Sequence, residues 1–389
     1  MKLAIVTETW PPDVNGVAIT LCRVTQGLQA LGYDIEIIRP YDRHSKSTTP
    51  GLEGMVQHLV RGLPIPGYQA FQMGLPAYGR LKATWQENRP DIVHIATEGP
   101  LGWSALRAAK ALNIPVSTDY RTNFGAYTKH YGLGFLEYLV ESYLRRFHNR
   151  AHATTVPTRA LARQLERLGF ERLHVVGRGI DSTRFNPSLR DDGLRASWSV
   201  GEEDVVLAYV GRLAAEKNLD LLISAYRSLV TSSPRARLLI VGDGPMRQAL
   251  TQQIPNAIIV GQKGDTDLAR HYASADAFLF PSLTETYGNV VPEAMASGLP
   301  VLAFDCAAAS ELIEHGISGL LAPVASPQEF IELATVLASD ASLRRSLGCV
   351  AREVAINNGW EQIIRRFSDL LAQTAAQART PIGSDRTRG

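Results

Sequence analysis

The chain has 389 residues, of which 45% are hydrophobic and 20% charged, and its formal net charge is +2. A single hydrophobic core stops growing at roughly 250–300 residues, so two domains are expected. No stretch reaches the roughly 20 apolar residues of a membrane-spanning helix, and residues 1–6 lead into a strand rather than a signal peptide. This pattern predicts a cytoplasmic protein. Three distant cysteines (Cys22, Cys306 and Cys349) without a CxxC pattern indicate neither a disulfide framework nor a zinc site.

The charge is unevenly distributed along the chain. Residues 1–185 hold 22 Lys and Arg against 15 Asp and Glu, a balance of +7, whereas the remainder holds 18 against 23, a balance of −5. A basic first half predicts contact with an anionic surface, such as the phospholipid head groups of a membrane. The alternative is a scatter of solvated arginines, which composition alone leaves open. No nucleic-acid partner is expected.

Short β-branched runs alternate with amphipathic stretches, a rhythm that predicts βαβ units and parallel sheets. In the first half, strands are predicted at residues 3–7, 34–38, 92–95, 116–118 and 153–156. In the second half, they are predicted at residues 205–210, 236–241, 257–260, 277–280 and 300–303.

Polar, aperiodic residues 181–201 separate the two series and predict a linker. The expected organisation is therefore a first doubly wound domain over 1–185 and a second over 186–359. A helix over 360–374 would cross back to the first domain, and residues 375–389 would form a disordered tail. Two such domains place a ligand in a cleft at the carboxyl ends of both sheets.

Two glycine-containing loops follow predicted strands. Gly16 lies just before a predicted helix, where the backbone can approach a ligand closely and free N–H groups favour an anion such as a diphosphate. Gly242 lies in a Gly-Asp-Gly-Pro turn that needs positive φ. Each loop has a structural alternative, an ordinary turn between a strand and a helix.

Two cations follow the first strand of the second domain. Arg212 and Lys217 come after residues 205–210, at the carboxyl end of that strand. Two cations there can hold a diphosphate and neutralise the charge that develops as it leaves. The alternative is solvated surface charge.

The segment of residues 281–301 carries the strongest signal in the chain. Gly288 begins a turn with bare N–H groups, and Pro292 fits a first helical turn, so Glu285 is placed on a loop and Glu293 at a helix start. Two carboxylates in this arrangement can accept hydrogen bonds from several hydroxyls of one polyol ligand. A helix-capping role is the alternative for Glu293 alone.

Together these motifs resemble glycosyltransferase family 4, whose GT-B fold consists of two Rossmann-like doubly wound domains. The resemblance runs through nearly the whole chain, and its specific elements are residues 15–17, 90–95, 179–181 with Phe185 and Pro187, 211–212 with 216–217, 242–245 and 285–293. The resemblance implies a retaining transfer of a mannose- or glucose-type hexose from a GDP- or UDP-sugar. It also implies that no metal or other cofactor is required.

The resemblance assigns roles to individual residues. Arg212, Lys217 and Glu285 would be catalytic, with Glu285 at the hexose hydroxyls and Glu293 at the nucleotide ribose. The expected donor-binding residues are Gly16, Arg212, Lys217, Gly242, Glu285, Gly288, Asn289 and Glu293. These partners are hydroxyl groups, so the two glutamates are not interpreted as the acid and nucleophile of a glycosidase. A metal site at Asp265 and Asp267 is disfavoured, because that spacing is common in loops before helices.

The acceptor side departs from the family pattern. Relatives commonly carry a histidine where this chain has Arg121, and an arginine cannot act as a base at neutral pH. His94 ends a predicted buried strand, where a structural role competes with a catalytic one. Asn123, Tyr127 and a predicted basic, aromatic helix over 135–148 complete the acceptor-side candidates.

The acceptor segment resembles that of relatives that glycosylate membrane lipids. Its apolar residues recur at helical spacing, which also suits ordinary core packing. The expected protein is a peripheral enzyme on the inner face of the cytoplasmic membrane with a lipid-linked acceptor. The alternatives are a soluble saccharide acceptor, a sugar-nucleotide epimerase with the same fold, and a binding module without turnover.

Overall fold

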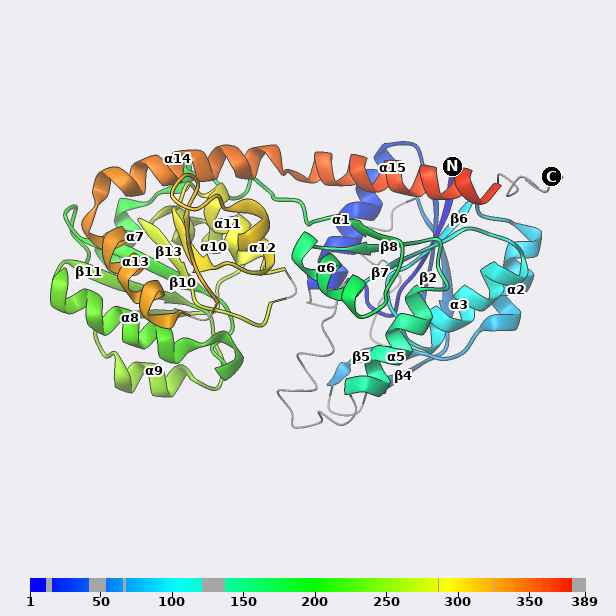
Figure 1. Ribbon diagram of the computed structural model, residues 1–389, viewed down its shortest axis with the longest axis horizontal. Helices are drawn as coiled ribbons and strands as arrows, with labels where there is room; N and C mark the ends of the chain where they lie inside the picture. Colours follow the sequence, from blue (N-terminus) through cyan, green and yellow to red (C-terminus); the bar gives the residue numbers. More distant parts are fainter. Residues whose placement is uncertain are drawn as a thin grey trace, which may run out of the picture. The chain divides into compact units, whose positions relative to one another are not determined.

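The computed structural model forms two compact units, unit 1 over Met1–Arg178 with Trp360–Gly389 and unit 2 over Gly179–Gly359 (Figure 1). The described residues are 1–11, 16–41, 54–65, 68–120, 137–285, 287–324 and 326–379. The boundary predicted after residue 185 therefore falls inside unit 2. No helix within the described ranges is long and apolar enough to cross a bilayer.

Unit 1 is built on a seven-stranded parallel sheet with the order β3-β2-β1-β6-β7-β8-β9. Its strands are β1 (Lys2–Val6), β2 (Asp34–Pro40), β3 (Val56–Val60), β6 (Ile92–Ile95), β7 (Val116–Asp119), β8 (Ala153–Val156) and β9 (Leu173–Val175). A separate antiparallel pair consists of β4 (Gly62–Ile65) and β5 (Tyr68–Gly74). All five strands predicted for this half are present. The sequence pattern missed β3, β4, β5 and β9, which are short or lie at an edge.

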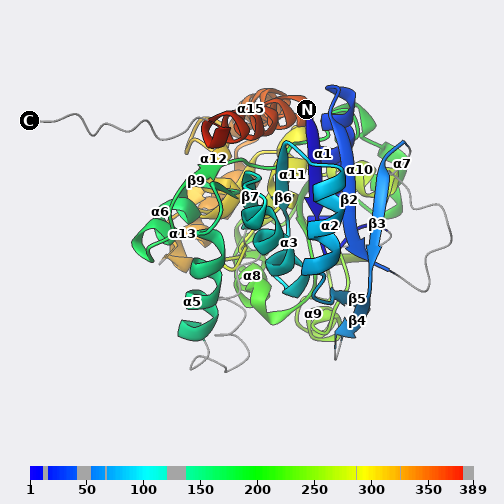
Figure 2. The same cartoon turned by 90° about the vertical axis from the view of Figure 1, so that its right-hand side faces the viewer.

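Alternating side chains of β1 supply two core layers of unit 1. Leu3 and Ile5 pack with α1 (Gly16–Ala30) and α15 (Trp360–Arg379). Ala4 and Val6 pack with α2 (Tyr78–Glu87) and α3 (Pro100–Ala111), which Figure 2 shows at the front of the unit. Two more helices, α5 (Glu137–His148) and α6 (Arg159–Arg167), flank β8 in sequence. Because helices cover both faces, the residues on both sides of β6, β7 and β8 are buried.

The helix α15 belongs to unit 1 although it follows unit 2 in the chain. A Cβ at Gly27 of α1 would lie 2.2 Å from the Cδ1 atom of Ile364 in α15, so a larger residue there would force the Ile364 side chain to move. The hydroxyl groups of Tyr33 and Ser368 lie 2.7 Å apart. The expectation of disorder from residue 375 is wrong for residues 375–379, which remain helical. Ala375 is buried in the unit 1 core, and this contact stabilises the last turns.

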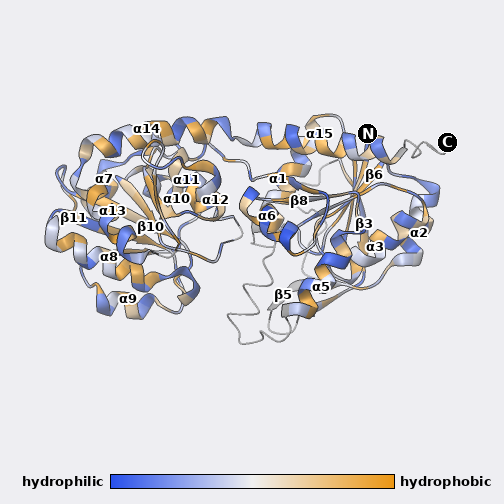
Figure 3. Cartoon of the chain, in the orientation of Figure 1, coloured by the Kyte–Doolittle hydropathy of each residue, from blue (hydrophilic) through white to orange (hydrophobic). Residues whose placement is uncertain are grey.

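Unit 2 is built on a six-stranded parallel sheet with the order β12-β11-β10-β13-β14-β15. The strands are β10 (Val205–Val210), β11 (Ala236–Val241), β12 (Ile258–Gly261), β13 (Ala277–Phe280), β14 (Val301–Phe304) and β15 (Leu320–Ala322). The helices are α7 (Asp192–Ser197), α8 (Leu219–Ser232), α9 (Arg247–Gln253), α10 (Asp265–Ala273), α11 (Val290–Ala296), α12 (Ala307–Leu312), α13 (Pro327–Ser339) and α14 (Ala341–Asn357). The central strands are mainly orange in Figure 3, whereas the surrounding helices alternate in colour. This contrast matches a sheet covered on both faces.

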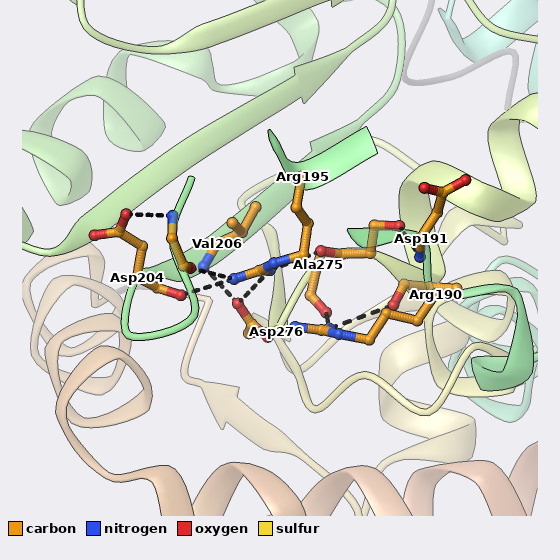
Figure 4. A network of polar contacts seen from close by, with 10 residues as sticks. Arg190, Asp191, Arg195, Asp204, Val206, Ala275 and Asp276 are labelled. Carbon is orange, nitrogen blue, oxygen red and sulfur yellow. Dashed lines mark hydrogen bonds and ion pairs between the residues drawn. The ribbon is translucent and has the colours of Figure 1, made fainter. Parts of the chain in front are cut away.

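The segment 181–201 is an ordered part of unit 2, which differs from the predicted linker. Arg195 in α7 is buried, and its guanidinium donates to the carboxylate of Asp276 at 3.0 Å and to the carbonyl oxygens of Ser274 and Asp204 (Figure 4). The same Asp276 carboxylate accepts from the backbone N–H of Val206 at the start of β10. A buried cation paired in this way anchors the segment, and periodicity does not reveal such an anchor.

Both sheets have a switch point, where the strand order reverses. In unit 1, β1 lies between β2 and β6, and in unit 2, β10 lies between β11 and β13. In open α/β sheets, ligands bind outside the carboxyl ends of the strands at this point. The fold therefore directs attention to the loops after β1 and β6 in unit 1 and after β10 and β13 in unit 2.

Candidate active site

The switch point of unit 2 brings together the two loops that the sequence singled out. Arg212 and Lys217 follow β10, and Glu285 follows β13, the strand that pairs with β10. The side chain of Asn218 donates to the carbonyl oxygen of Pro281 at 3.1 Å, and the hydroxyl of Thr284 donates to the carbonyl oxygen of Glu216 at 2.9 Å. These two bonds fix one loop against the other.

A partly buried ion pair joins the two loops. The ammonium group of Lys217 donates to Oε1 of Glu285, and the hydroxyl of Ser282 donates to the same oxygen at 3.0 Å. Asn218 adopts the left-handed conformation with φ 56°, which turns the chain directly after Lys217. The side chains of Lys217 and Glu285 are 19% and 15% exposed, so both remain within reach of a ligand. A cation and a carboxylate at one switch point can bind an anionic group and a hydroxyl group side by side.

Arg212 extends from the same loop into solvent. Its side chain is 65% exposed, and its guanidinium lies 3.5 Å from the carboxylate of Glu216. It lines a pocket of about 410 Å³ together with Gly242, Asp243, Gln262 and Lys263, among other residues. Gln262 and Lys263, which follow β12, were not singled out by the sequence. Their place in the pocket follows from the pairing of β12 with β11, which a sequence pattern does not give.

The glycine of the turn after β11 is required by backbone packing. Gly242 has φ 147°, and a Cβ at this position would lie 1.9 Å from the carbonyl oxygen of Gly211. The N–H of Gly211 in turn donates to the carbonyl oxygen of Val241 at 3.0 Å. The turn therefore lies directly against the loop that carries Arg212. Glycine is therefore needed at position 242 because a side chain there would collide with the loop that forms part of the pocket wall.

Glu293 lies in the first turn of α11 and is largely enclosed. The hydroxyl of Tyr272 donates to its carboxylate at 3.0 Å, and burial raises the pKa of Glu293 to about 7. Gly288 has φ 87°, as a tight turn before a helix requires, and Asn289 is the N-cap residue of α11. The predicted placement of Glu285 on a loop and Glu293 at a helix start matches the structure. The binding roles of Glu285, Gly288, Asn289 and Glu293 stay predictions.

The first-domain candidates are distributed differently. Gly16 is the first residue of α1, in agreement with its predicted place at a helix start. His94 is buried in β6, where Nδ1 lies 3.0 Å from the hydroxyl of Ser117 and the ring packs edge-to-face on Phe367. These contacts favour the structural role for His94. Arg121, Asn123 and Tyr127 lie outside the described residues.

A carboxylate that the sequence did not single out lies at the switch point of unit 1. Glu8 follows β1, and its carboxylate accepts from the backbone N–H of Leu101 at 3.3 Å at the start of α3. Burial raises the pKa of Glu8 to about 7. The sequence signal that could have identified Glu8 was the presence of a carboxylate directly after the first predicted strand. Its connection with α3 becomes visible only in the folded unit.

In the described part of the chain, no group of three or more His, Cys, Asp or Glu side chains could hold a metal ion. The carboxylate of Asp267, part of the disfavoured metal motif, lies 3.5 Å from the ammonium group of Lys263 and 3.7 Å from the guanidinium of Arg270. Ion pairing with these two cations is therefore sufficient to explain the acidic side chain at position 267. The expectation that no metal is required stays a prediction.

The two units together have the GT-B fold of glycosyltransferases, as the likeness to solved structures shows. The Anabaena HepE protein, solved in complex with UDP, superposes with a TM-score of 0.75 at 19% identity and covers 96% of this chain and 100% of that chain. The sucrose-phosphate synthase of Thermosynechococcus elongatus has a TM-score of 0.75 at 19% identity, covering 97% and 99%. Identities this low establish the fold alone.

Sequence comparison gives the family. A model described as Glycosyltransferase Family 4 matches residues 14–184, and one described as Glycosyl transferases group 1 matches residues 204–340. A GDP-mannose-dependent alpha-mannosyltransferase of Mycobacterium tuberculosis is 33% identical over 383 residues, covering 97% of this chain and 99% of the relative. The chain therefore belongs to glycosyltransferase family 4, and it is a hexosyltransferase.

Two further relatives are named for the transfer of other sugars, and one of these names includes a lipid product. The sulfoquinovosyl transferase of Arabidopsis thaliana is 32% identical over 309 residues, which cover 77% of this chain and 60% of the relative. The alpha-monoglucosyldiacylglycerol synthase of Acholeplasma laidlawii is 25% identical over 346 residues, covering 82% and 84%.

Proposed function

We propose that the protein is a retaining hexosyltransferase that uses a nucleotide-diphosphate sugar, with GDP-mannose as the leading candidate, and glycosylates a membrane lipid. The observation that carries the proposal is the Lys217–Glu285 pair at the unit 2 switch point, together with the pocket that Arg212 of the same loop lines. The mannosyltransferase relative named for GDP-mannose supports this choice of donor.

Each charged residue has a role in this mechanism. Arg212 and Lys217 hold the diphosphate and stabilise the negative charge that develops as it departs. Once Lys217 engages phosphate, the Glu285 carboxylate accepts hydrogen bonds from the hexose hydroxyls. Glu293, positioned by the hydroxyl of Tyr272, accepts from the ribose hydroxyls. The charged groups are already placed when the donor arrives, which lowers the cost of reorganisation.

The transfer itself exchanges one bond for another on the same face of the sugar. The bond from the anomeric carbon to the phosphate oxygen breaks, and a bond to the acceptor oxygen forms. The acceptor proton passes to the leaving phosphate, so no protein base and no metal ion is required. An unchanged rate in excess EDTA, together with a product that keeps the anomeric configuration of the donor by NMR, is the expected result. Inversion or loss of activity in EDTA would contradict this mechanism.

A lipid acceptor is supported by the relative named as an alpha-monoglucosyldiacylglycerol synthase. In unit 1, α5 exposes Tyr138 and Leu139, which are 69% and 60% exposed, and carries Arg145 and Arg146 in its last turn. Exposed apolar side chains and an exposed cation, Arg146, on the same helix suit peripheral binding to an anionic bilayer. The proposed place of action is the cytoplasmic face of a membrane.

The test begins with the donor. A melting panel with GDP, UDP, ADP and their sugars identifies the nucleotide, because a ligand at about 100 times its dissociation constant adds about 2.7 kcal/mol of stability. The identified donor is then incubated with and without diacylglycerol-type acceptors. Release of free nucleoside diphosphate only with an acceptor supports transfer. Conversion of the donor sugar without acceptor would indicate an epimerase, and binding without any turnover would indicate a binding module.

A further inference from the structure

Unit 1 contains a basic pocket that the proposed transfer reaction does not use. It lies between the start of α2, the outer side of α3 and the segment after α5, and its volume is about 270 Å³. The lining residues are Tyr78, Trp103, Leu106, Arg107, Lys110 and Arg150. We call this set of six residues the basic pocket.

The charges of the basic pocket are not compensated by acidic groups. It contains three cations and no carboxylate, and none of the three forms an ion pair with a carboxylate in the described part of the chain. Arg107 and Lys110 are exposed and Arg150 is half-buried, and like charges grouped in this way repel one another. A bound anion would remove this repulsion.

Two aromatic rings orient the guanidinium groups. The Arg107 guanidinium carbon lies 5.1 Å from the centre of the Tyr78 ring, and that of Arg150 lies 5.3 Å from the centre of a Trp103 ring. Within the described residues, neither guanidinium donates a hydrogen bond to protein. Stacking occupies the face of a guanidinium and leaves its N–H edge available, which is the edge that binds phosphate in a bidentate manner.

The pKa of Lys110 is also affected by the uncompensated positive charge of its neighbours. Partial desolvation lowers the pKa of this exposed ammonium group, and repulsion from Arg150 and Arg172 lowers it further. An anion held between these groups would reverse the repulsion and favour the charged ammonium.

The basic pocket is separate from the switch point of unit 1. The helix α3 begins at Pro100, shortly after the carboxyl end of β6, and Lys110 lies in its last turn. Arg150 comes shortly before β8 begins at Ala153. The charged end of the basic pocket therefore lies toward the amino ends of the strands, the side opposite to that where doubly wound sheets bind their substrates.

We propose that the basic pocket is a second ligand site that binds a phosphate group carrying a small polar substituent, of the size of glycerol phosphate. Arg107 and Arg150 grip the phosphate oxygens, Lys110 supplies the third charge, and Tyr78 and Trp103 pack against the substituent. A volume of about 270 Å³ is below the roughly 300–1,000 Å³ of sites for drug-sized molecules, which favours a head group over a nucleotide. The same chemistry occurs in a membrane phospholipid and in a soluble phosphoester.

The experiment compares two variants of equal charge. Arg107→Gln/Arg150→Gln removes two cations from the basic pocket, and Arg163→Gln/Arg167→Gln removes two from the exposed face of α6. Lys110→Gln is a third variant that leaves both ring stacks intact. Binding of sn-glycerol 3-phosphate is measured by calorimetry at constant ionic strength. Sedimentation is measured with phosphatidylcholine vesicles, with and without phosphatidylglycerol.

We expect the wild type and the α6 variant to bind glycerol phosphate alike. The pocket variants should bind at least about tenfold more weakly, because each of them lacks at least one charge-assisted contact to the phosphate. No binding by the wild type, or equal loss in both double variants, overturns the proposal. If glycerol phosphate also displaces the wild-type protein from anionic vesicles, the ligand of the basic pocket is the head group of a phospholipid. If the pocket variants sediment with anionic vesicles as the wild type does, but bind glycerol phosphate more weakly by calorimetry, the ligand of the basic pocket is a soluble phosphoester. Donor melting shifts, which depend on unit 2, test the proposed function separately.

Discussion

At the residue scale, the Lys217–Glu285 pair connects the donor site to the chemistry of transfer. The two side chains come from different strands, and each satisfies the other while no donor is bound. A ligand that offers phosphate to one and hydroxyl groups to the other replaces the pair with stronger, directed contacts. The residues are therefore most informative when substituted separately.

Lys217→Ala should reduce turnover by about 100-fold or more, because loss of one comparable electrostatic donor has this effect on a developing negative charge. The measurement is kcat with the donor identified by melting. Arg235→Ala is the control, since it removes an exposed cation of unit 2 that pairs with Glu203 on the surface. Near-normal turnover in Lys217→Ala would remove this residue from the catalytic set.

The two glutamates should respond differently to substitution. Glu293→Gln should weaken binding of the bare nucleoside diphosphate, because the amide nitrogen replaces an acceptor for the ribose. Glu285→Gln should leave that affinity unchanged and lower the turnover of the sugar donor. Calorimetry with the diphosphate and initial rates with the donor separate the two effects. Equal loss of nucleotide affinity in both variants would show that the roles are divided wrongly.

Glu8 and Glu293 should make the protein less stable as the pH rises. Burial raises the pKa of each to about 7 from an ordinary value of 4.5, so the folded protein keeps protons that the unfolded chain has released. Stability then falls with increasing pH between about 4.5 and 7. Melting temperatures across this window should show a flatter decline in Glu8→Gln and in Glu293→Gln than in wild type. The exposed Glu203→Gln is the control, and identical slopes in all proteins would contradict the prediction.

At the element scale, the donor pocket depends on how closely the turn after β11 approaches the loop after β10. Helices and strands on either side hold these loops, and Tyr209 in β10 donates its hydroxyl to the carbonyl oxygen of Arg212 at 3.2 Å. The site is thus supported by the sheet that carries it. A change in backbone separation should affect nucleotide binding without touching any charged group.

Gly242→Ala should destabilise unit 2 and weaken nucleotide binding. Its Cβ would lie 1.9 Å from the carbonyl oxygen of Gly211, and the backbone at φ 147° disfavours any side chain. Strain of this kind costs roughly 1–3 kcal/mol or more. Gly264→Ala is the matched control, because a Cβ there meets nothing within 4 Å. The readouts are the melting temperature and the nucleotide affinity, and equal behaviour of both variants would refute the packing argument.

At the scale of the whole molecule, charge is divided between the halves of the chain, with +7 before residue 186 and −5 after it. Three arginines at or just after the end of α5 differ in their surroundings. Arg145 is occupied within unit 1, where it donates to the carbonyl oxygen of Leu168 at 2.8 Å and pairs with Glu141. Arg146 is exposed, and Arg150 belongs to the basic pocket. Substituting Arg145 would thus disturb the fold as well as the charge.

Membrane docking should combine apolar insertion by α5 with salt-sensitive attraction. We expect sedimentation with anionic vesicles at low salt and release at high salt, because the Debye length falls from about 10 Å at 0.1 M to about 3 Å at 1 M. Tyr138→Ser/Leu139→Ser should weaken binding by about tenfold without loss of stability, since both side chains are already exposed. Val230→Ser, on an exposed position of α8, is the control. Protein that remains in the supernatant at low salt would favour a soluble saccharide acceptor.

The sequence by itself determined the fold class and the main features of the donor site. Parallel strands buried on both faces leave a strong local pattern, so β6, β8, β10, β11 and β13 were predicted with the bounds observed. The sequence also allowed residues 211–217 and 285–293 to be recognised as candidate donor-site segments, for a similar reason. Loops at the carboxyl ends of such strands concentrate glycine, charge and helix starts within a short segment.

Only the tertiary structure decided which distant groups meet. The pairing of Lys217 with Glu285, the anchoring of 181–201 by buried Arg195 and the continuation of α15 through Ala375 each depend on contacts between segments far apart in the chain. The basic pocket likewise joins α2, α3 and Arg150, which lies shortly after α5. Periodicity records the faces of an element that are buried, but it does not record the partner that buries them.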